Sequence, residues 1–223
     1  MSSSDRDAAV RRPVAVLPFR LHASVTCPPP AALALSLAWE LGDLDGDRAE
    51  RDLTSLSAAI LPEAETQPAA QLAALGEAVT NLALCARLDG GPQELLLDKA
   101  LERGHAHPVL IAIVLQETGR RAGLPIGIVA GERGHFLAHQ RLTEPRVLDP
   151  QTGRLTDADT LGTLRWHCGH QLAAALLDLL QPRYERSGDL ARALQVAKLR
   201  TTLPFEVMAE AEQRLHRVTA RLN

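Results

Sequence analysis

The sequence predicts a helix-rich α+β fold with a small antiparallel sheet flanked by helices. Alanine and leucine recur along the chain and are strong helix formers, while aromatic residues make up only 3% of it. Near the middle, a predicted helix is followed by three short segments of strand-forming residues, at 126–130, 135–140 and 146–148. Turn residues separate these segments, and a helix followed by successive short strands indicates an α+β unit.

The order of the predicted elements divides the chain into four regions. The run from Cys27 to Pro30 cannot continue a helix, so the N-terminal region is expected to be an irregular lead-in. A helical subdomain follows, then the core helix with its strands, and finally a helical tail. The four regions span residues 1–30, 31–103, 104–160 and 161–223.

Apolar residues spaced three to four apart predict the helices themselves. The helix at 68–88 places Cys85 on its apolar face, so we expect this thiol in the core. Pro182 is expected to separate two helices of the tail. The predicted helices cover residues 31–41, 48–60, 68–88, 94–103, 109–122, 161–180, 184–199 and 204–222.

Charge and cysteine content exclude several classes of function. The net charge is −3 with no polybasic block, so neither nucleic acid nor a membrane is expected as a partner. No signal peptide or membrane span is predicted. The three cysteines are odd in number and widely spaced, which indicates free thiols in a reducing compartment. We therefore expect a cytoplasmic protein.

Arginines are frequent in the tail, but acidic residues alternate with them. This pattern predicts a solvated surface of mixed charge rather than a nucleic-acid patch. The arginines concerned are Arg183, Arg186, Arg192, Arg200, Arg214, Arg217 and Arg221.

Two residues of the predicted strands could form an acid–base pair. His135 opens the second strand and Asp149 ends the third, and neighbouring antiparallel strands can place them side by side. A carboxylate beside an imidazole fixes its tautomer and supports its protonated form. The missing third group would be a thiol at the start of the preceding helix, where the helix dipole lowers a thiol pKa.

The order of these motifs resembles that of the transglutaminase-like superfamily, which shares it with papain-like thiol enzymes. The segments are most similar to the bacterial SirB-type branch, and the turn into 191–194 resembles a tetratricopeptide repeat. The resemblance implies a transglutaminase-like (papain-like) core with a repeat-like tail that packs on it as a cap. The motifs that carry it are 96–103, 108–112, 119–125, 134–137 and 148–150.

The same resemblance shows that the nucleophile is missing. In active members the cysteine lies about four helical turns before the Gly-Leu-Pro stop, and counting back from Gly123 leads to Pro108. No Cys, Ser or Thr lies between Gly104 and Gln116. We therefore favour a non-catalytic protein that binds a protein or peptide, with no cofactor. The alternative is a hydrolase or acyltransferase in which His135 and Asp149 activate water.

The sequence gives weaker support to a zinc site and to a substitute nucleophile. His105, His107, His135 and His139 could gather around zinc, but on one strand His135 and His139 are separated by about 13 Å at roughly 3.3 Å per residue. No metal is therefore expected. Cys168 lies between two histidines in the sequence and could replace the missing thiol, but adjacent side chains on a helix do not face each other.

Overall fold

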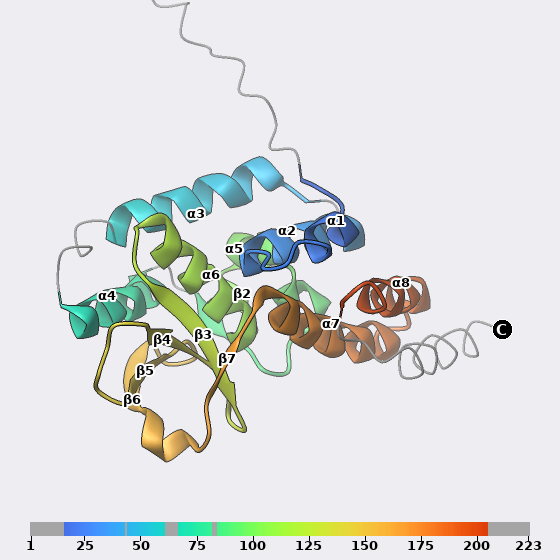
Figure 1. Ribbon diagram of the computed structural model, residues 1–223. Helices are drawn as coiled ribbons and strands as arrows, with labels where there is room; N and C mark the ends of the chain where they lie inside the picture. Colours follow the sequence, from blue (N-terminus) through green and yellow to red (C-terminus); the bar gives the residue numbers. More distant parts are fainter. Residues whose placement is uncertain (1–15, 43, 61–66, 82–83, 205–223) are drawn as a thin grey trace, which may run out of the picture.

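Helices surround a five-stranded sheet and one buried helix in this computed structural model (Figure 1). The structure describes residues 16–42, 44–60, 67–81 and 84–204. In this part of the chain, no helix is both long and apolar enough to cross a membrane.

The buried helix is α6 (Pro108–Arg121), and it forms the centre of the core. All seven residues from Val109 to Leu115 are at most 1% exposed. A helix that is apolar on every side must be covered on every side, and the sheet, α2, α3, α4 and α7 all contact it. Pro108 occupies the first helical position, where its missing N–H costs no hydrogen bond.

The sheet is antiparallel throughout and has the strand order β6-β5-β4-β3-β7. Its side chains alternate between two faces, as expected for such a sheet. Ile128, Leu137 and Leu148 belong to the main core with α6, while Val129 and Phe136 belong to a smaller apolar cluster on the other face. The strands are β3 (Ile126–Gly131), β4 (Gly134–His139), β5 (Arg146–Asp149), β6 (Arg154–Asp157) and β7 (Arg165–His167).

Five helices precede α6 and cover the rest of the core. Arg121 of α6 bridges Glu117 and Glu50, with Nε–Oε1 and Nη1–Oε1 distances of 2.7 and 2.6 Å, and so ties α6 to α3. Burial alone would raise the pKa of Glu117, but hydrogen bonds from Arg120 and Arg121 lower it overall. The helices are α1 (Phe19–Ala23), α2 (Pro30–Leu41), α3 (Gly46–Ile60), α4 (Pro68–Asn81) and α5 (Leu97–Arg103), with a 3-10 turn, η2 (Pro92–Leu95), before α5.

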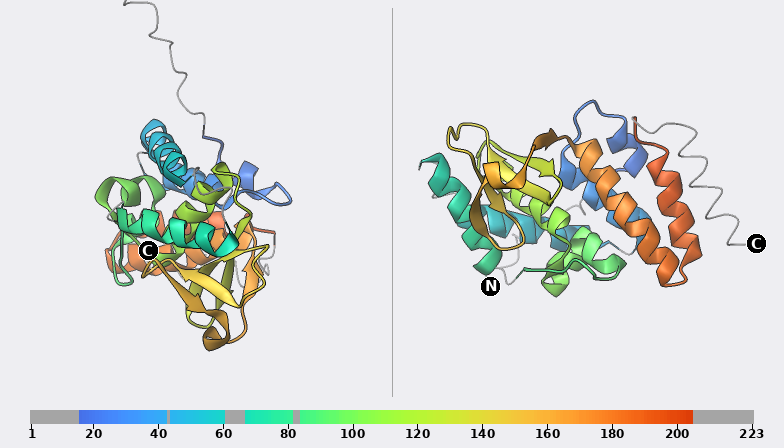
Figure 2. Two further views of the ribbon diagram at one scale, coloured as in Figure 1. Left: turned by 90° about the vertical axis from the view of Figure 1, so that its left-hand side faces the viewer. Right: turned by 90° about the horizontal axis from the view of Figure 1, so that it is seen from below.

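The last two described helices, α7 (Gly169–Arg186) and α8 (Leu190–Arg200), lie side by side and pack on α2 (Figure 2). Side chains of α8 satisfy the last carbonyls of α2. Arg192 Nε donates to the Leu41 carbonyl at 2.9 Å, and Gln195 Nε2 donates to that of Glu40. These bonds replace the C-terminal cap that α2 otherwise lacks.

Several predicted elements are confirmed. The three predicted strands and the helices at 31–41, 48–60 and 109–122 agree with the structure to within two residues at each end. The predicted helix at 94–103 is divided into η2 and α5. The short helix α1 lies in a region expected to be irregular, and β6 was not predicted. The predicted helix at 204–222 lies outside the described residues apart from its first residue.

The prediction for Cys85 was wrong. Helix α4 ends at Asn81, and Cys85 is an exposed residue of β1 (Cys85–Ala86). This strand pairs in parallel with β2 (His105–Ala106). Apolar spacing alone continued the helix because nothing near Cys85 in the sequence reveals a partner twenty residues away.

The predicted helix at 161–180 was wrong at both ends. Its first residue, Leu161, ends the 3-10 turn η3 (Ala158–Leu161). Residues 165–167 form β7, which pairs with β3 and extends the sheet. Pro182 lies inside α7 rather than after it. Pro182 has no N–H to donate within the helix, and in the same turn Arg183 Nη1 donates to the Leu179 carbonyl at 3.0 Å.

Helix α4 approaches the β5–β6 turn so closely that only glycine fits at position 76. A Cβ atom on Gly76 would lie 2.2 Å from the Gly153 carbonyl oxygen. We expect Gly76→Ala to reduce the free energy of unfolding by about 1–3 kcal/mol, measured by urea denaturation. In Gly42→Ala the new methyl group meets only the Ala38 carbonyl oxygen at 3.6 Å, so this control should change stability much less. Equal effects of the two substitutions would contradict the close approach.

Candidate functional site

A cavity of about 340 Å³ opens where α6 begins, β4 begins and β5 ends. The residues that the sequence singled out, Pro108, His135 and Asp149, all line it. The other lining residues are Leu88, His107, Val109, Arg133, Gly134, Phe136, Gln151, Thr156 and Leu161. This cavity, called the cleft below, is the candidate site.

At the start of α6, in the cleft, the N-cap residue accepts hydrogen bonds from the first helical N–H groups. His107 is the N-cap residue, and its Nδ1 accepts the N–H of Val109 at 3.3 Å. The His107 carbonyl accepts the N–H groups of Leu110 and Ile111. Since an accepting Nδ1 requires a neutral ring, the proton is on Nε2. Burial, together with the nearby charge of Arg183, lowers the pKa of His107 to about 4, which keeps the ring neutral.

His135 is the second neutral imidazole of the cleft. Its ring lies edge-on to that of His167, with centroids 5.4 Å apart. His135 Nε2 and His167 Nδ1 are buried and have no hydrogen-bond partner among the described residues. Burial, followed by repulsion from His167 and His107, lowers the pKa of His135 to about 4, and burial also lowers the pKa of His167.

Asp149 lines the cleft but is not bonded to His135. Strand register pairs Leu137 with Leu148, so Asp149 points to the opposite face of the sheet from His135. Its Oδ1 accepts the Gln151 N–H at 2.8 Å and its Oδ2 accepts the Thr152 hydroxyl at 3.0 Å. The carboxylate therefore stabilises the β5–β6 turn. Among the described residues it makes no hydrogen bond to the imidazole.

No thiol lines the described part of the cleft, and its one hydroxyl belongs to Thr156. Cys168 is instead the N-cap of α7. Its side chain accepts the Gln171 N–H, while Gln171 Oε1 accepts the Cys168 N–H at 2.9 Å. Cys168, which we considered as a substitute nucleophile, therefore caps α7 and does not line the cleft. Cys27 is exposed, outside the cleft lining.

The remaining histidines of the zinc hypothesis have separate partners. His105 Nδ1 lies 2.7 Å from the Arg103 carbonyl oxygen. His139 is buried, with Nε2 2.7 Å from Gln71 Oε1 of α4, while its Nδ1 accepts the Arg141 N–H. Across the described ranges, no group of three or more His, Cys, Asp or Glu side chains could hold a metal ion.

Arg183 is a site residue that the sequence did not reveal. We predicted a solvated side chain, but Arg183 is buried and donates to the carbonyls of Gly90 and Leu88 as well as Leu179. It thereby fixes the segment that carries Leu88 to the wall of the cleft. Other arginines of that cluster pair with nearby groups, such as Arg200 with Asp178 at 3.2 Å. Arg214, Arg217 and Arg221 lie outside the described residues.

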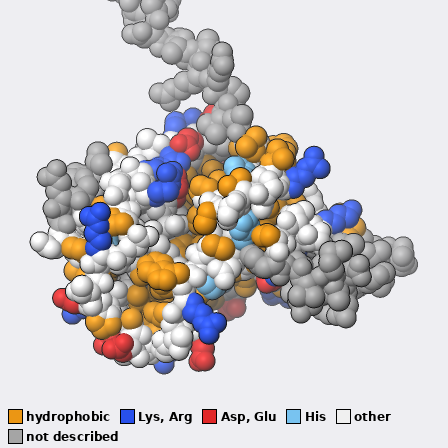
Figure 3. Space-filling model, in the orientation of Figure 1, with side chains coloured by type: hydrophobic (Ala, Val, Ile, Leu, Met, Phe, Trp, Pro, Cys, Tyr) orange, Lys and Arg blue, Asp and Glu red, His pale blue; other side chains and the backbone are white. Residues whose placement is uncertain are grey.

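Both tryptophans of the chain are about half exposed, at 47% for Trp39 and 55% for Trp166. On the face of the molecule shown in Figure 3, hydrophobic and histidine side chains lie at the centre, with charged side chains mainly around them. The Trp166 ring lies on Gly127, where a Cβ atom would be 2.5 Å from it. Glycine at this position therefore lets the indole lie flat on the sheet.

Comparison with known proteins places this geometry in context. A family model described as the transglutaminase-like superfamily matches residues 48–187, a range that includes the whole cleft. No curated protein matches the chain. A solved structure described as "Crystal structure of menin reveals the binding site for Mixed Lineage Leukemia (MLL) protein" is similar in fold, with a TM-score of 0.51 and 14% sequence identity. The match covers 91% of this chain and 60% of the menin chain.

The neutral state of the cleft histidines predicts loss of stability in acid. The pKa of His135 falls from 6.5 to about 4 on folding, so between these values the unfolded chain binds more protons. Stability from this group is therefore complete above pH 6.5, decreases as the pH falls, and levels off below about 4. We expect the native chain to lose about 1–2 kcal/mol more than His135→Gln between pH 7 and pH 4.5, measured by urea denaturation at each pH. A difference between the two proteins that does not change with pH would contradict the assignment.

Proposed function

The chain belongs to the transglutaminase-like superfamily, and from this premise we propose that it binds a protein or peptide without transforming it. The observation that carries the proposal is the start of α6. Pro108 stands where a thiol would be needed, and His107 caps the helix beside it. Proline has no group that can attack a carbonyl, so a covalent acyl intermediate has no nucleophile at this position.

The cleft chemistry favours an uncharged, hydrogen-bonding ligand. Both His107 and His135 have a pKa of about 4 and are neutral near pH 7. The N–H of His107 is on Nε2, and the buried Nε2 of His135 has no hydrogen-bond partner among the described residues. Main-chain amide groups of an extended peptide both donate and accept hydrogen bonds, and they match neutral imidazoles better than a carboxylate does.

One comparison and one feature of the fold support binding as the function. The similar menin structure is described as having a binding site for another protein. The paired helices α7 and α8 are consistent with a tetratricopeptide-like tail, and we further propose that the chain belongs to the SirB-type branch and acts in the cytoplasm.

A second candidate function follows from one observation. His135 and Asp149 line the same cavity, and a change at the end of β5 that turned the Asp149 side chain to the face of His135 would bring carboxylate and imidazole together. The chain would then be a hydrolase or acyltransferase that uses the pair to activate water. This hypothesis requires Asp149 to release both Gln151 and Thr152.

The binding proposal predicts a cross-linked partner at the cleft. Arg133 lines the cleft and is exposed, whereas its exposed neighbour Glu132 does not line it. We expect a photo-reactive amino acid at position 133 to cross-link a protein or peptide in cells, detected by mass spectrometry. The same amino acid at position 132 should give several-fold less product.

Turnover measurements separate the two candidate functions. The binding proposal predicts that neither the native chain nor His135→Ala hydrolyses peptide or ester substrates above background. Turnover that His135→Ala abolishes without lowering the melting temperature would favour the enzyme. Equal cross-linking at positions 132 and 133 would count against binding at the cleft.

A further inference from the structure

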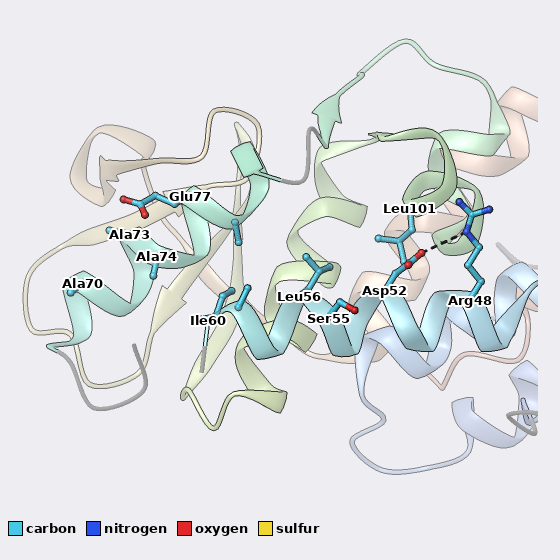
Figure 4. Close-up of a pocket in the computed structure, with 12 residues that line it drawn as sticks. Arg48, Asp52, Ser55, Leu56, Ile60, Ala70, Ala73, Ala74, Glu77 and Leu101 are labelled. Carbon is cyan, nitrogen blue, oxygen red and sulfur yellow. Dashed lines mark ion pairs between the residues drawn. The ribbon is translucent and has the colours of Figure 1, made fainter. Parts of the chain in front are cut away.

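A second cavity, of about 670 Å³, is separate from the cleft and shares no lining residue with it. Figure 4 shows the elements that line it. Helix α3 forms the floor, α4 stands on one side, and Leu101 of α5 stands on the other. We call this cavity the α3–α4 groove.

Apolar side chains line most of this groove. Five of them are alanines, and four of these, Ala70, Ala73, Ala74 and Ala78, belong to α4 (Figure 4). An alanine wall lets the backbone of a bound segment come close, since nothing beyond Cβ projects from it. Leu101 adds a larger, partly exposed apolar side chain, while Leu56 and Ile60 are buried beneath the groove. At about 1.5 Å per residue, a floor helix of this length offers roughly four turns of contact.

Charge at the groove is predominantly acidic. Arg48 is already shared between Asp52 and Glu102, at 3.8 and 3.4 Å. Glu77 is an exposed lining residue on the opposite side. Two acidic lining residues therefore face one basic residue, while Glu102 beside them is shared between Arg48 and Lys99, at 3.4 and 3.6 Å. An occupant with basic residues at its edges is complementary to this arrangement.

We propose that the α3–α4 groove docks an amphipathic helix of a partner protein. The apolar stripe of that helix, at positions i, i+3, i+4 and i+7, packs on the alanines at the surface of the groove and on Leu101. Lysine or arginine residues flanking the stripe meet Asp52 and Glu77. The groove fits a helix better than an extended strand because helices line it and no sheet edge is among its lining residues.

A displayed peptide library tests this proposal on the full chain. The library contains helix-forming sequences of about 15 residues with both faces randomised, together with an equal number of proline-containing extended sequences. We expect enriched binders to share an apolar stripe at helical spacing with flanking lysine or arginine. A selected peptide, made synthetically and labelled, then serves as the probe for affinity measurements by fluorescence anisotropy.

Two pairs of variants locate the binding. Ala59 and its neighbour Ala58 are both exposed residues of α3, but only Ala59 lines the groove. Ala59→Arg should weaken the probe at least tenfold, and Ala58→Arg should change its affinity less than twofold. Glu77→Lys should weaken the basic probe and strengthen an analogue with glutamates at the flanking positions.

The outcome does not depend on the cleft proposal. Enriched peptides without a helical stripe, no enrichment at all, or equal effects of Ala58→Arg and Ala59→Arg would each overturn the groove assignment. Binding that is lost in His135→Ala but kept in Ala59→Arg would also overturn it and would assign the peptide to the cleft.

Discussion

Complete burial of the N-terminal half of α6 is the constraint on which the rest of the structure depends. A helix with no polar side from Val109 to Leu115 is stable only when other elements exclude water all around it. The sheet covers one side and surrounding helices cover the others. Polar contacts are left to the last turns, where Glu117 and Arg121 join α6 to α3. The position of the helix start, and hence of the cleft, is therefore set by the core.

The residue at that start stabilises the end of the helix. Pro108 has the fixed φ angle that a first helical residue needs and loses no hydrogen bond. His107 completes the helix end with its ring and its carbonyl. A thiol enzyme would leave these helix N–H groups to stabilise a thiolate. Here the cap uses the Val109 N–H, so the helix start is built as a structural end.

Local patterns in the sequence were sufficient for α6 and the first three strands of the sheet, because their periodicity and turn residues agree. Several failures concern long-range contacts. Strand β7 forms only because β3 offers it an edge, and Cys85 is drawn out of a helix by β2. Arg183 carries no local sign that backbone carbonyls about ninety residues away will bury it.

The cleft shows the same limit at the scale of one residue. His135 and Asp149 were correctly expected on neighbouring strands, and both reach the cavity. Whether they face each other depends on the register between β4 and β5, since a shift of one residue moves a side chain to the other face. That register is fixed by the length of the connecting loop and by the pairing of Leu137 with Leu148. Sequence alone does not specify it.

Nitrogens of His135, in the cleft, and of His167, beside it, are unpaired within the described chain and lower the stability of the free protein. A buried polar atom without a partner costs about 1–3 kcal/mol, and His135 and His167 each bury one such nitrogen. An apolar side chain of similar size at either position would avoid that cost and would pack against Ile128 and Leu137 of the same face. A hydrogen-bonding group supplied from outside the chain offsets the cost only while it is bound. The two imidazoles therefore make the free protein less stable than it could be, a cost that the proposed ligand would offset.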